Sequence, residues 1–201
     1  MEETSSPFLY IRSARLPFRA DLTIPRRNDP IMNDFIYNQK KIPKDQWRYG
    51  LRTSAATGCG WIAAYNALRL MGYHAEPEKL IRYYQRHVPG LNGTLGTFVL
   101  TPVRLFQKLG FEVTVTGRRE QFDALTKSSD ACILFYHWAN LPKLGAHFTA
   151  LQYRDGQFVG YNTYKTSAGP DRYGDSLEGF LRKRHYFGTV LIGLKNPRKT
   201  T

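Results

Sequence analysis

The sequence predicts an α+β fold in which helices come first and an antiparallel sheet follows. Apolar residues recur with helical spacing from Cys59 to Gly72 and again from Pro77 to Arg86, whereas segments after Gly110 alternate as strands do. With 201 residues, of which 42% are hydrophobic and 14% aromatic, the chain is long enough to bury one good-sized core. We therefore expect a single domain over residues 1–201.

Composition along the chain divides this expected domain into three parts. Residues 1–50 are rich in proline and short polar breaks and show no sustained helical period, which predicts an extended N-terminal wrap. Residues 51–110 form the predicted helical lobe, and residues 111–201 form the predicted antiparallel sheet lobe. We expect the functional cleft at the boundary between the two lobes.

Local signals define the helices of the first lobe. The first helix opens at Cys59 and ends before Gly72, and the second runs from Pro77 to about Arg86. A glycine-rich stretch over Val88–Thr101 matches no phosphate-loop pattern and is typical of a surface loop. A third helix is predicted over Thr101–Gly110, with Thr101 as its N-cap and a proline in its first turn.

The second lobe shows strand-like alternation separated by turn signals. Strands are predicted over 111–116, 131–136, 145–151, 158–162 and 187–194, with a short helix over 176–184. Arg154-Asp155-Gly156-Gln157 has the composition of a two-residue hairpin turn between the third and fourth of these strands.

The hairpin brings two polar residues together. If Asp155 and Gly156 occupy the turn, pairing counted outward places His147 opposite Tyr164, and Asn162 becomes a diagonal neighbour of His147 on the same face. Diagonal neighbours lie about 7 Å apart at their bases, so an amide oxygen of Asn162 could reach an imidazole N–H. The predicted hairpin therefore places His147 and Asn162 within hydrogen-bonding reach of each other.

Cys59 stands between two glycines at the start of the first predicted helix. Unpaired backbone N–H groups at a helix N-terminus stabilise a thiolate, and such positions lower a cysteine pKa from about 8.5. We therefore expect an acidic, nucleophilic thiol at Cys59. Taken alone, a cysteine is more often a small core side chain, and only the combination with His147 and Asn162 favours catalysis.

The order of cysteine on a helix N-terminus, histidine on one strand and asparagine on the next resembles the papain-like cysteine peptidase superfamily. The Cys-Gly start, the Gly-Ala-His-Phe-Thr-Ala-Leu strand and the Gly-Tyr-Asn strand look most like compact bacterial peptidases related to the bacteriocin-leader processing enzymes. The resemblance covers roughly 53–162. It implies that Cys59 is the nucleophile, His147 the general base and acid, and Asn162 the residue that orients the imidazole.

One element departs from that pattern. These peptidases usually carry a glutamine about six residues before the cysteine, whose side chain helps to bind the oxyanion, and Thr53 stands there in this chain. Gln46 lies in the wrong place. The polar alternatives for this role are Thr53, Ser54, Thr57 and Tyr49.

The resemblance implies amide hydrolysis through a thioester, on a peptide or protein substrate and without a cofactor. The same residues also serve acyltransferases and transglutaminases, so that alternative stays open. A third possibility is a non-catalytic binding protein on the same fold, with a peptide or a nucleic acid as its ligand.

Other cysteine and histidine chemistry is disfavoured by spacing. Cys132 lies in an apolar run of strand length and is assigned to the core, with both thiols expected to be free. The five histidines form no Cys-x-x-Cys, His-Glu-x-x-His or closely spaced pair, so no metal site is predicted.

The net charge of +13 is compatible with weak, non-specific binding of polyanions as well as with an enzyme acting on anionic substrates. The excess of basic residues is spread along the chain, and no nucleic-acid recognition motif is visible. The sequence contains neither a signal-peptide pattern nor about 18 consecutive apolar residues, so we expect no membrane span and a cytoplasmic location.

Overall fold

The structure, a computed structural model, describes residues 9–10, 35–87, 96–140 and 143–196. Most of the predicted wrap over residues 1–50, and most of the glycine-rich stretch before Thr101, lie outside these ranges. Within them, strand β1 (Leu9–Tyr10) pairs with β4, so part of the N-terminal segment joins the sheet.

A seven-stranded sheet forms the centre of the molecule, with strand order β1-β4-β9-β5-β6-β7-β8 and antiparallel pairing throughout. After β1, its strands are β4 (Glu112–Thr116), β5 (Ala131–Asn140), β6 (Lys143–Arg154), β7 (Gln157–Tyr161), β8 (Asp171–Gly174) and β9 (Phe187–Lys195). A separate two-stranded ribbon pairs β2 (Arg48–Tyr49) with β3 (Arg52–Thr53). The predicted α+β class, with helices before most of the sheet, is confirmed.

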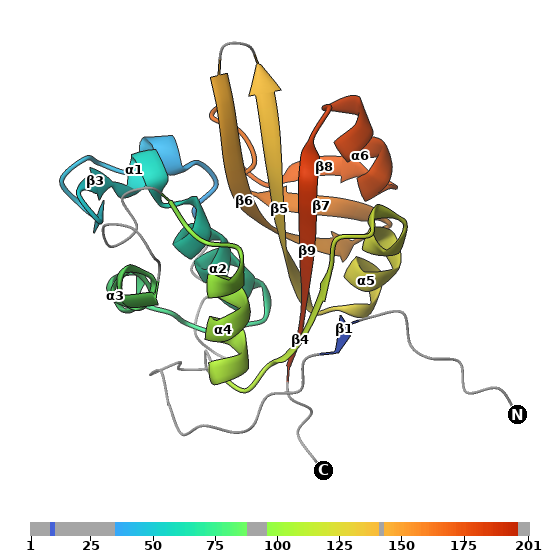
Figure 1. Ribbon diagram of the computed structural model, residues 1–201, viewed down its shortest axis with the longest axis horizontal. Coiled ribbons are helices and arrows are strands. Elements are labelled where there is room, and N and C mark those ends of the chain that lie inside the picture. Colours follow the sequence, from blue (N-terminus) through green and yellow to red (C-terminus); the bar gives the residue numbers. More distant parts are fainter. Residues whose placement is uncertain (1–8, 11–34, 88–95, 141–142, 197–201) are drawn as a thin grey trace, which may run out of the picture.

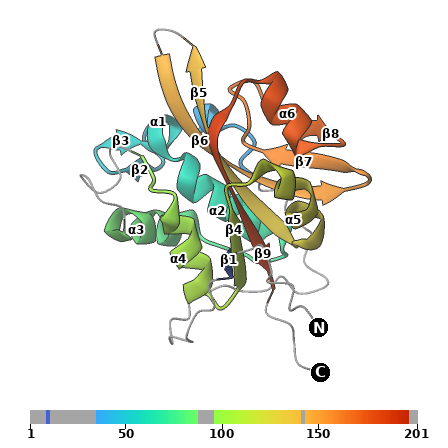
Figure 2. The ribbon, with the colours of Figure 1, turned by 45° about the vertical axis from the view of Figure 1, so that its right-hand side comes forward.

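Helices cover both faces of the sheet (Figures 1 and 2). On one side lie α1 (Ser54–Thr57), α2 (Cys59–Leu70), α3 (Pro77–His87) and α4 (Leu100–Lys108). On the other side lie α5 (Phe122–Ser128) and α6 (Leu177–Lys183). Among the described residues, the 3-10 turns η1 (Gln39–Lys41) and η3 (Arg119–Gln121) lie in the connections. The sequence predicted α2, α3, α4 and α6 and missed the short α1 and α5.

The alternation of β5 divides the apolar interior into two clusters. Ala131 and Ile133 belong to the cluster under α2, α3 and α4, whereas Cys132, Leu134 and Tyr136 belong to the cluster under α5 and α6. Because neighbouring strand residues point to opposite faces, one strand supplies both cores. Cys132 is fully buried and free, as predicted.

Helix α2 lies within the first of these clusters, against β6. Its Trp61 is fully buried, and the indole N–H donates to the hydroxyl of Ser54 at 3.2 Å. The helix ends where the sequence predicted, since Gly72 follows with φ of 81°, a left-handed conformation that favours glycine. Burial of α2 along most of its length fixes the position of its first residue, Cys59.

Helix α4 begins one residue before the predicted N-cap. Thr101 lies in its first turn, where its backbone N–H already donates to Phe98 O at 2.9 Å, and Val99 is the N-cap. The assignment of Thr101 as the cap was therefore wrong, although Pro102 does occupy the first turn.

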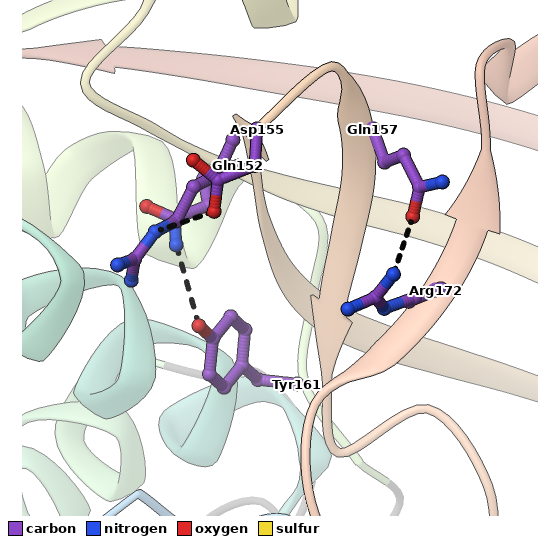
Figure 3. A network of polar contacts seen from close by, with 6 residues as sticks. Gln152, Asp155, Gln157, Tyr161 and Arg172 are labelled. Carbon is purple, nitrogen blue, oxygen red and sulfur yellow. Dashed lines mark hydrogen bonds and ion pairs between the residues drawn. The ribbon is translucent and has the colours of Figure 1, made fainter.

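The hairpin between β6 and β7 has the predicted turn, with Arg154 paired to Gln157. Asp155 and Gly156 have φ of 51° and 77°, as a type I′ turn requires. Polar contacts reinforce this end of the sheet (Figure 3): an Arg154–Asp155 ion pair at 3.3 Å, a Gln152–Tyr161 hydrogen bond at 3.3 Å and an Arg172–Gln157 hydrogen bond at 3.3 Å.

The pairing does not extend as far as predicted. Strand β7 ends at Tyr161, which pairs with Ala150, because the next residue, Asn162, has φ of 63° and leaves the extended conformation. The expected pairing of His147 with Tyr164 is therefore absent from the ladder between β6 and β7.

Candidate active site

His147 and Asn162 meet, but through a different atom from the one predicted. The imidazole Nε2 lies 2.6 Å from the backbone oxygen of Asn162. The left-handed turn at Asn162 ends β7 and directs this carbonyl to the imidazole, whereas the side-chain amide has other partners. The predicted contact between the amide oxygen and the imidazole is thus replaced by a main-chain contact.

This contact determines the protonation of the ring. A carbonyl oxygen only accepts hydrogen bonds, so Nε2 must carry the proton and donate it to Asn162 O. In the neutral imidazole, Nδ1 then has a free lone pair. His147 therefore has the tautomer that a general base needs, with Nδ1 as the basic atom.

The side chain of Asn162 is held by Gln39 through reciprocal hydrogen bonds. The backbone N–H of Gln39 donates to Asn162 Oδ1 at 2.8 Å, and Asn162 Nδ2 donates to Gln39 Oε1 at 3.1 Å. Both residues are buried, with exposed fractions of 8% and 2%. Gln39 also donates through Nε2 to Ala55 O at 3.3 Å, which joins η1 to α1. The turn that positions His147 is thereby fixed from η1.

Cys59 is the first residue of α2 and is partly exposed. Burial raises the pKa of its thiol above the ordinary value, although backbone N–H groups of Phe148, Gly60 and Cys59 itself and the charge of Lys40 act to lower that pKa. The predicted acidic thiol is therefore not found, because desolvation outweighs the helix terminus. The sulfur lies near the backbone of β6, beside the residue that follows His147.

The imidazole of His147 also favours its neutral form. Burial lowers its pKa, the hydrogen bond to Asn162 O raises it, and the charge of Lys40 lowers it further. Burial thus disfavours the charged form of both groups, so the structure does not favour a thiolate–imidazolium pair.

The two candidate catalytic side chains are not hydrogen-bonded to each other within the part of the chain that the structure describes. His147 shares a strand face with Tyr136, its cross-strand partner, whereas the following residue, Phe148, packs in the cluster that contains α2. A cleft of about 650 Å³ is lined by His147 and Asn162 but not by Cys59. The thiol is thus neither hydrogen-bonded to the imidazole nor part of the cleft that the imidazole lines.

The structure separates the candidates for the side-chain half of an oxyanion hole. Ser54 accepts from Trp61, and the hydroxyl of Tyr49 is within hydrogen-bond distance of Thr97 at 3.1 Å. The Oγ1 of Thr57 is buried and has no hydrogen-bond partner among the described residues. Thr57, in the turn before Cys59, is thus a hydroxyl with a free donor, while Thr53 makes no side-chain cap bond.

Two residues of this site were missed by sequence reasoning. Gln39 and Lys40 lie in the segment predicted as an extended wrap, yet η1 brings both to the cleft beside His147. Lys40 Nζ donates to Ala55 O at 2.7 Å. The Asn-Gln-Lys-Lys run carries no local pattern that predicts these long-range contacts, so only the folded chain reveals them.

Metal ligands do not gather elsewhere in the described ranges, where no group of three or more His, Cys, Asp or Glu side chains is placed to hold an ion. Nor does any described helix have the length and apolar character needed to cross a bilayer.

Comparisons with known proteins add a structural likeness. No protein-family model matches the sequence, and no curated protein matches it. Among solved structures, the chain is similar to the peptidase domain of Streptococcus ComA, described as a bifunctional ABC transporter involved in a quorum-sensing pathway, at 18% identity and a TM-score of 0.47. The match covers 71% of this chain and 93% of that chain. A likeness at this level leaves the activity to be argued from the site itself.

Proposed function

We propose that the protein is a cysteine peptidase or a related amide hydrolase, with Cys59 as the nucleophile, His147 as the general base and Asn162 as a positioning residue. The observation that carries this proposal is the 2.6 Å contact between His147 Nε2 and Asn162 O, which leaves Nδ1 as a free base. Cys59 supports it by opening a buried helix against the strand that carries His147.

The proposed reaction begins with a neutral thiol. Nδ1 of His147 takes the proton of Cys59 as sulfur bonds to the carbonyl carbon of the substrate. The C–N bond then breaks, and the same proton passes from Nδ1 to the leaving amine, which leaves a thioester. Water next gives a proton to Nδ1 while its oxygen attacks the thioester, and that proton returns to sulfur as the acid is released.

This sequence requires the imidazole and the thiol to come together when substrate binds. Catalytic hydrogen bonds are often long or poorly aligned before substrate is present and tighten in the complex. The oxyanion would be bound by the backbone N–H of Cys59, with the Thr57 hydroxyl as the proposed second donor. No cofactor takes part in these steps.

A second candidate is a non-catalytic peptide-binding protein on the same fold. Two observations favour it: Cys59 is absent from the lining of the cleft, and burial raises the pKa of its thiol. This candidate retains the cleft beside His147 but assigns no turnover to it.

A fluorescence-quenched peptide library, with mass spectrometry of the products, separates the two candidates. We expect wild type and the control Cys132→Ala to cleave the same members, and Cys59→Ala to remain folded without cleaving any. Turnover that persists in Cys59→Ala contradicts the assigned nucleophile. Folded wild type that cleaves no member of the library favours the non-catalytic candidate.

A further inference from the structure

The cleft beside His147 is formed by segments that are distant in sequence. Residues of η1 meet the ends of β5 and β6, the segment that follows β7, and the C-terminal end of α6. Its volume of about 650 Å³ lies in the range of small-molecule and short-peptide pockets, roughly 300–1,000 Å³. The cleft therefore has room for a few residues of a peptide next to the proposed base.

Charge in this cleft has one sign. No aspartate or glutamate lines it. The four basic residues in its lining are Lys40, Lys165, Lys183 and Arg184. All four are exposed, and none forms an ion pair with an acidic side chain of the described residues. Like charges brought together in a concave site repel one another unless an anion joins them. The arrangement is thus complementary to a negatively charged ligand.

Two of these cations are held in place. The guanidinium of Arg184 lies over the ring of Tyr164 at 4.9 Å from its centroid, and Lys40 Nζ donates to Ala55 O at 2.7 Å. Contacts of this kind reduce the conformational freedom that a long side chain loses when it binds a ligand. Lys165 and Lys183 complete the rim as exposed lysines.

The aromatic walls favour a peptide over a nucleic acid. Tyr136 is buried, with an exposed fraction of 2%, and stacks on Tyr186 at 4.2 Å between ring centroids. Single-stranded nucleic acids are bound by aromatic faces that are free to stack on bases. Here Tyr136 and Tyr186 cover each other, Arg184 covers Tyr164, and the Trp138 ring lies against Gly145, so each aromatic ring of the lining already has a partner.

We propose that this cleft binds the carboxylate of an acidic peptide segment and so selects substrates with negative charge near the reacting bond. That the bound peptide is a substrate rests on the proposed function, but the binding itself does not depend on turnover. The carboxylate could belong to aspartate or glutamate side chains or to the C-terminus of the peptide, and the experiment below distinguishes these sources.

Binding is measured by fluorescence anisotropy on Cys59→Ala, so that failure of catalysis cannot mask the result. The probes are labelled hexapeptides containing two glutamates, their glutamine counterparts, and both forms with an amidated C-terminus. The double variant Lys165→Gln/Lys183→Gln tests the cleft. Arg82→Gln/Arg86→Gln on α3 is the matched control, because it removes the same charge from exposed residues outside the cleft lining.

We expect the glutamate peptides to bind more tightly than their glutamine counterparts, and the cleft variant to weaken that binding by about threefold to tenfold, as two exposed charge contacts allow. The control variant should stay within about twofold, and rising salt should weaken the wild type. A glutamate-over-glutamine preference that survives amidation assigns the site to acidic side chains, whereas a loss of binding on amidation that is equal for glutamate and glutamine peptides assigns it to the C-terminus.

Three results would overturn the proposal. The first is equal binding of all four probes, whatever their side chains and C-terminus. The second is an equal loss in the cleft and control variants, and the third is tighter, cleft-dependent binding of a single-stranded oligonucleotide of the same net charge. Acidic peptides that bind but are never cleaved by wild type would support the cleft assignment and count against the proposed hydrolase.

Discussion

The reciprocal contact between Gln39 and Asn162 can be tested by a double-mutant cycle. Gln39→Leu removes the acceptor for Asn162 Nδ2 at 3.1 Å and the donor to Ala55 O, while it retains most of the buried side-chain volume. Asn162→Gly removes the amide but retains the carbonyl that contacts His147, and glycine adopts the φ of 63° without strain. The four proteins of the cycle separate the contact between the side chains from its surroundings.

The magnitude follows from the bonds that each change removes. In the wild type, Gln39→Leu loses two side-chain hydrogen bonds and leaves a buried amide N–H of Asn162 unsatisfied, so unfolding free energy should fall by about 2–3 kcal/mol. In the Asn162→Gly background only the contact with Ala55 is lost, at about 1 kcal/mol. The expected coupling energy is therefore about 1–2 kcal/mol.

Urea denaturation of the four proteins measures this coupling, provided that the m-values agree. Additivity within about 0.3 kcal/mol would refute the reasoning, because residues that share a buried contact should not behave independently. A kinetic arm tests the main-chain contact. Asn162→Gly should retain most of kcat/KM, whereas His147→Ala should lose about 100-fold or more, the usual contribution of a general base. Equal losses would mean that the amide, and not the carbonyl, orients the imidazole.

Two further predictions concern α2. In a Cys132→Ala background, the rate of Cys59 alkylation by iodoacetamide should be lower than that of a free thiol at neutral pH and should rise only at alkaline pH. The reason is that burial raises the pKa of Cys59, so less thiolate is present. An alkylation rate that reaches its plateau below neutral pH would instead indicate a thiolate–imidazolium ion pair. Gly60→Ala should lower the free energy of unfolding by about 1–3 kcal/mol, since the new Cβ would lie 2.2 Å from Thr97 Oγ1. Gly169→Ala, whose Cβ meets nothing within 4 Å, is its control in the same denaturation experiment and should change stability by less than about 0.5 kcal/mol.

The regular elements were predictable where local signals were strong. Helix α2 has both a periodic apolar face and a glycine stop, and the β6–β7 turn has Asp155-Gly156 between alternating segments. Helix α5 was missed because its seven residues, Phe122–Ser128, are too short to show a period, and its burial against the sheet stabilises it. Strand β8 was missed for the same reason, since four residues of mixed character, Asp171–Gly174, become a strand only by pairing with β7.

Sequence reasoning brought His147 and Asn162 together but assigned the contact to the wrong atom, and it missed Gln39 and Lys40. Counting outward from the hairpin turn brought His147 and Asn162 together, yet the count assumed that β7 continues to Asn162. A single residue with positive φ ends the strand there and substitutes a main-chain oxygen for the amide. Asparagine tolerates the left-handed conformation better than most residues, so an asparagine at position 162 is compatible with a strand end there but does not by itself predict one.

The electrostatics of Cys59 follow from a competition that sequence cannot weigh. The helix N-terminus and Lys40 act to lower the thiol pKa, and burial against β6 acts to raise it. Only the folded position of the sulfur shows that desolvation is the larger effect. Burial likewise lowers the pKa of His147, so the charged form of both groups is disfavoured, and in the proposed reaction the proton moves as the carbon–sulfur bond forms. The proposed mechanism depends on His147 being held in one tautomer, and the contact with Asn162 O favours that tautomer while the Gln39 side chain fixes Asn162 from a segment distant in sequence.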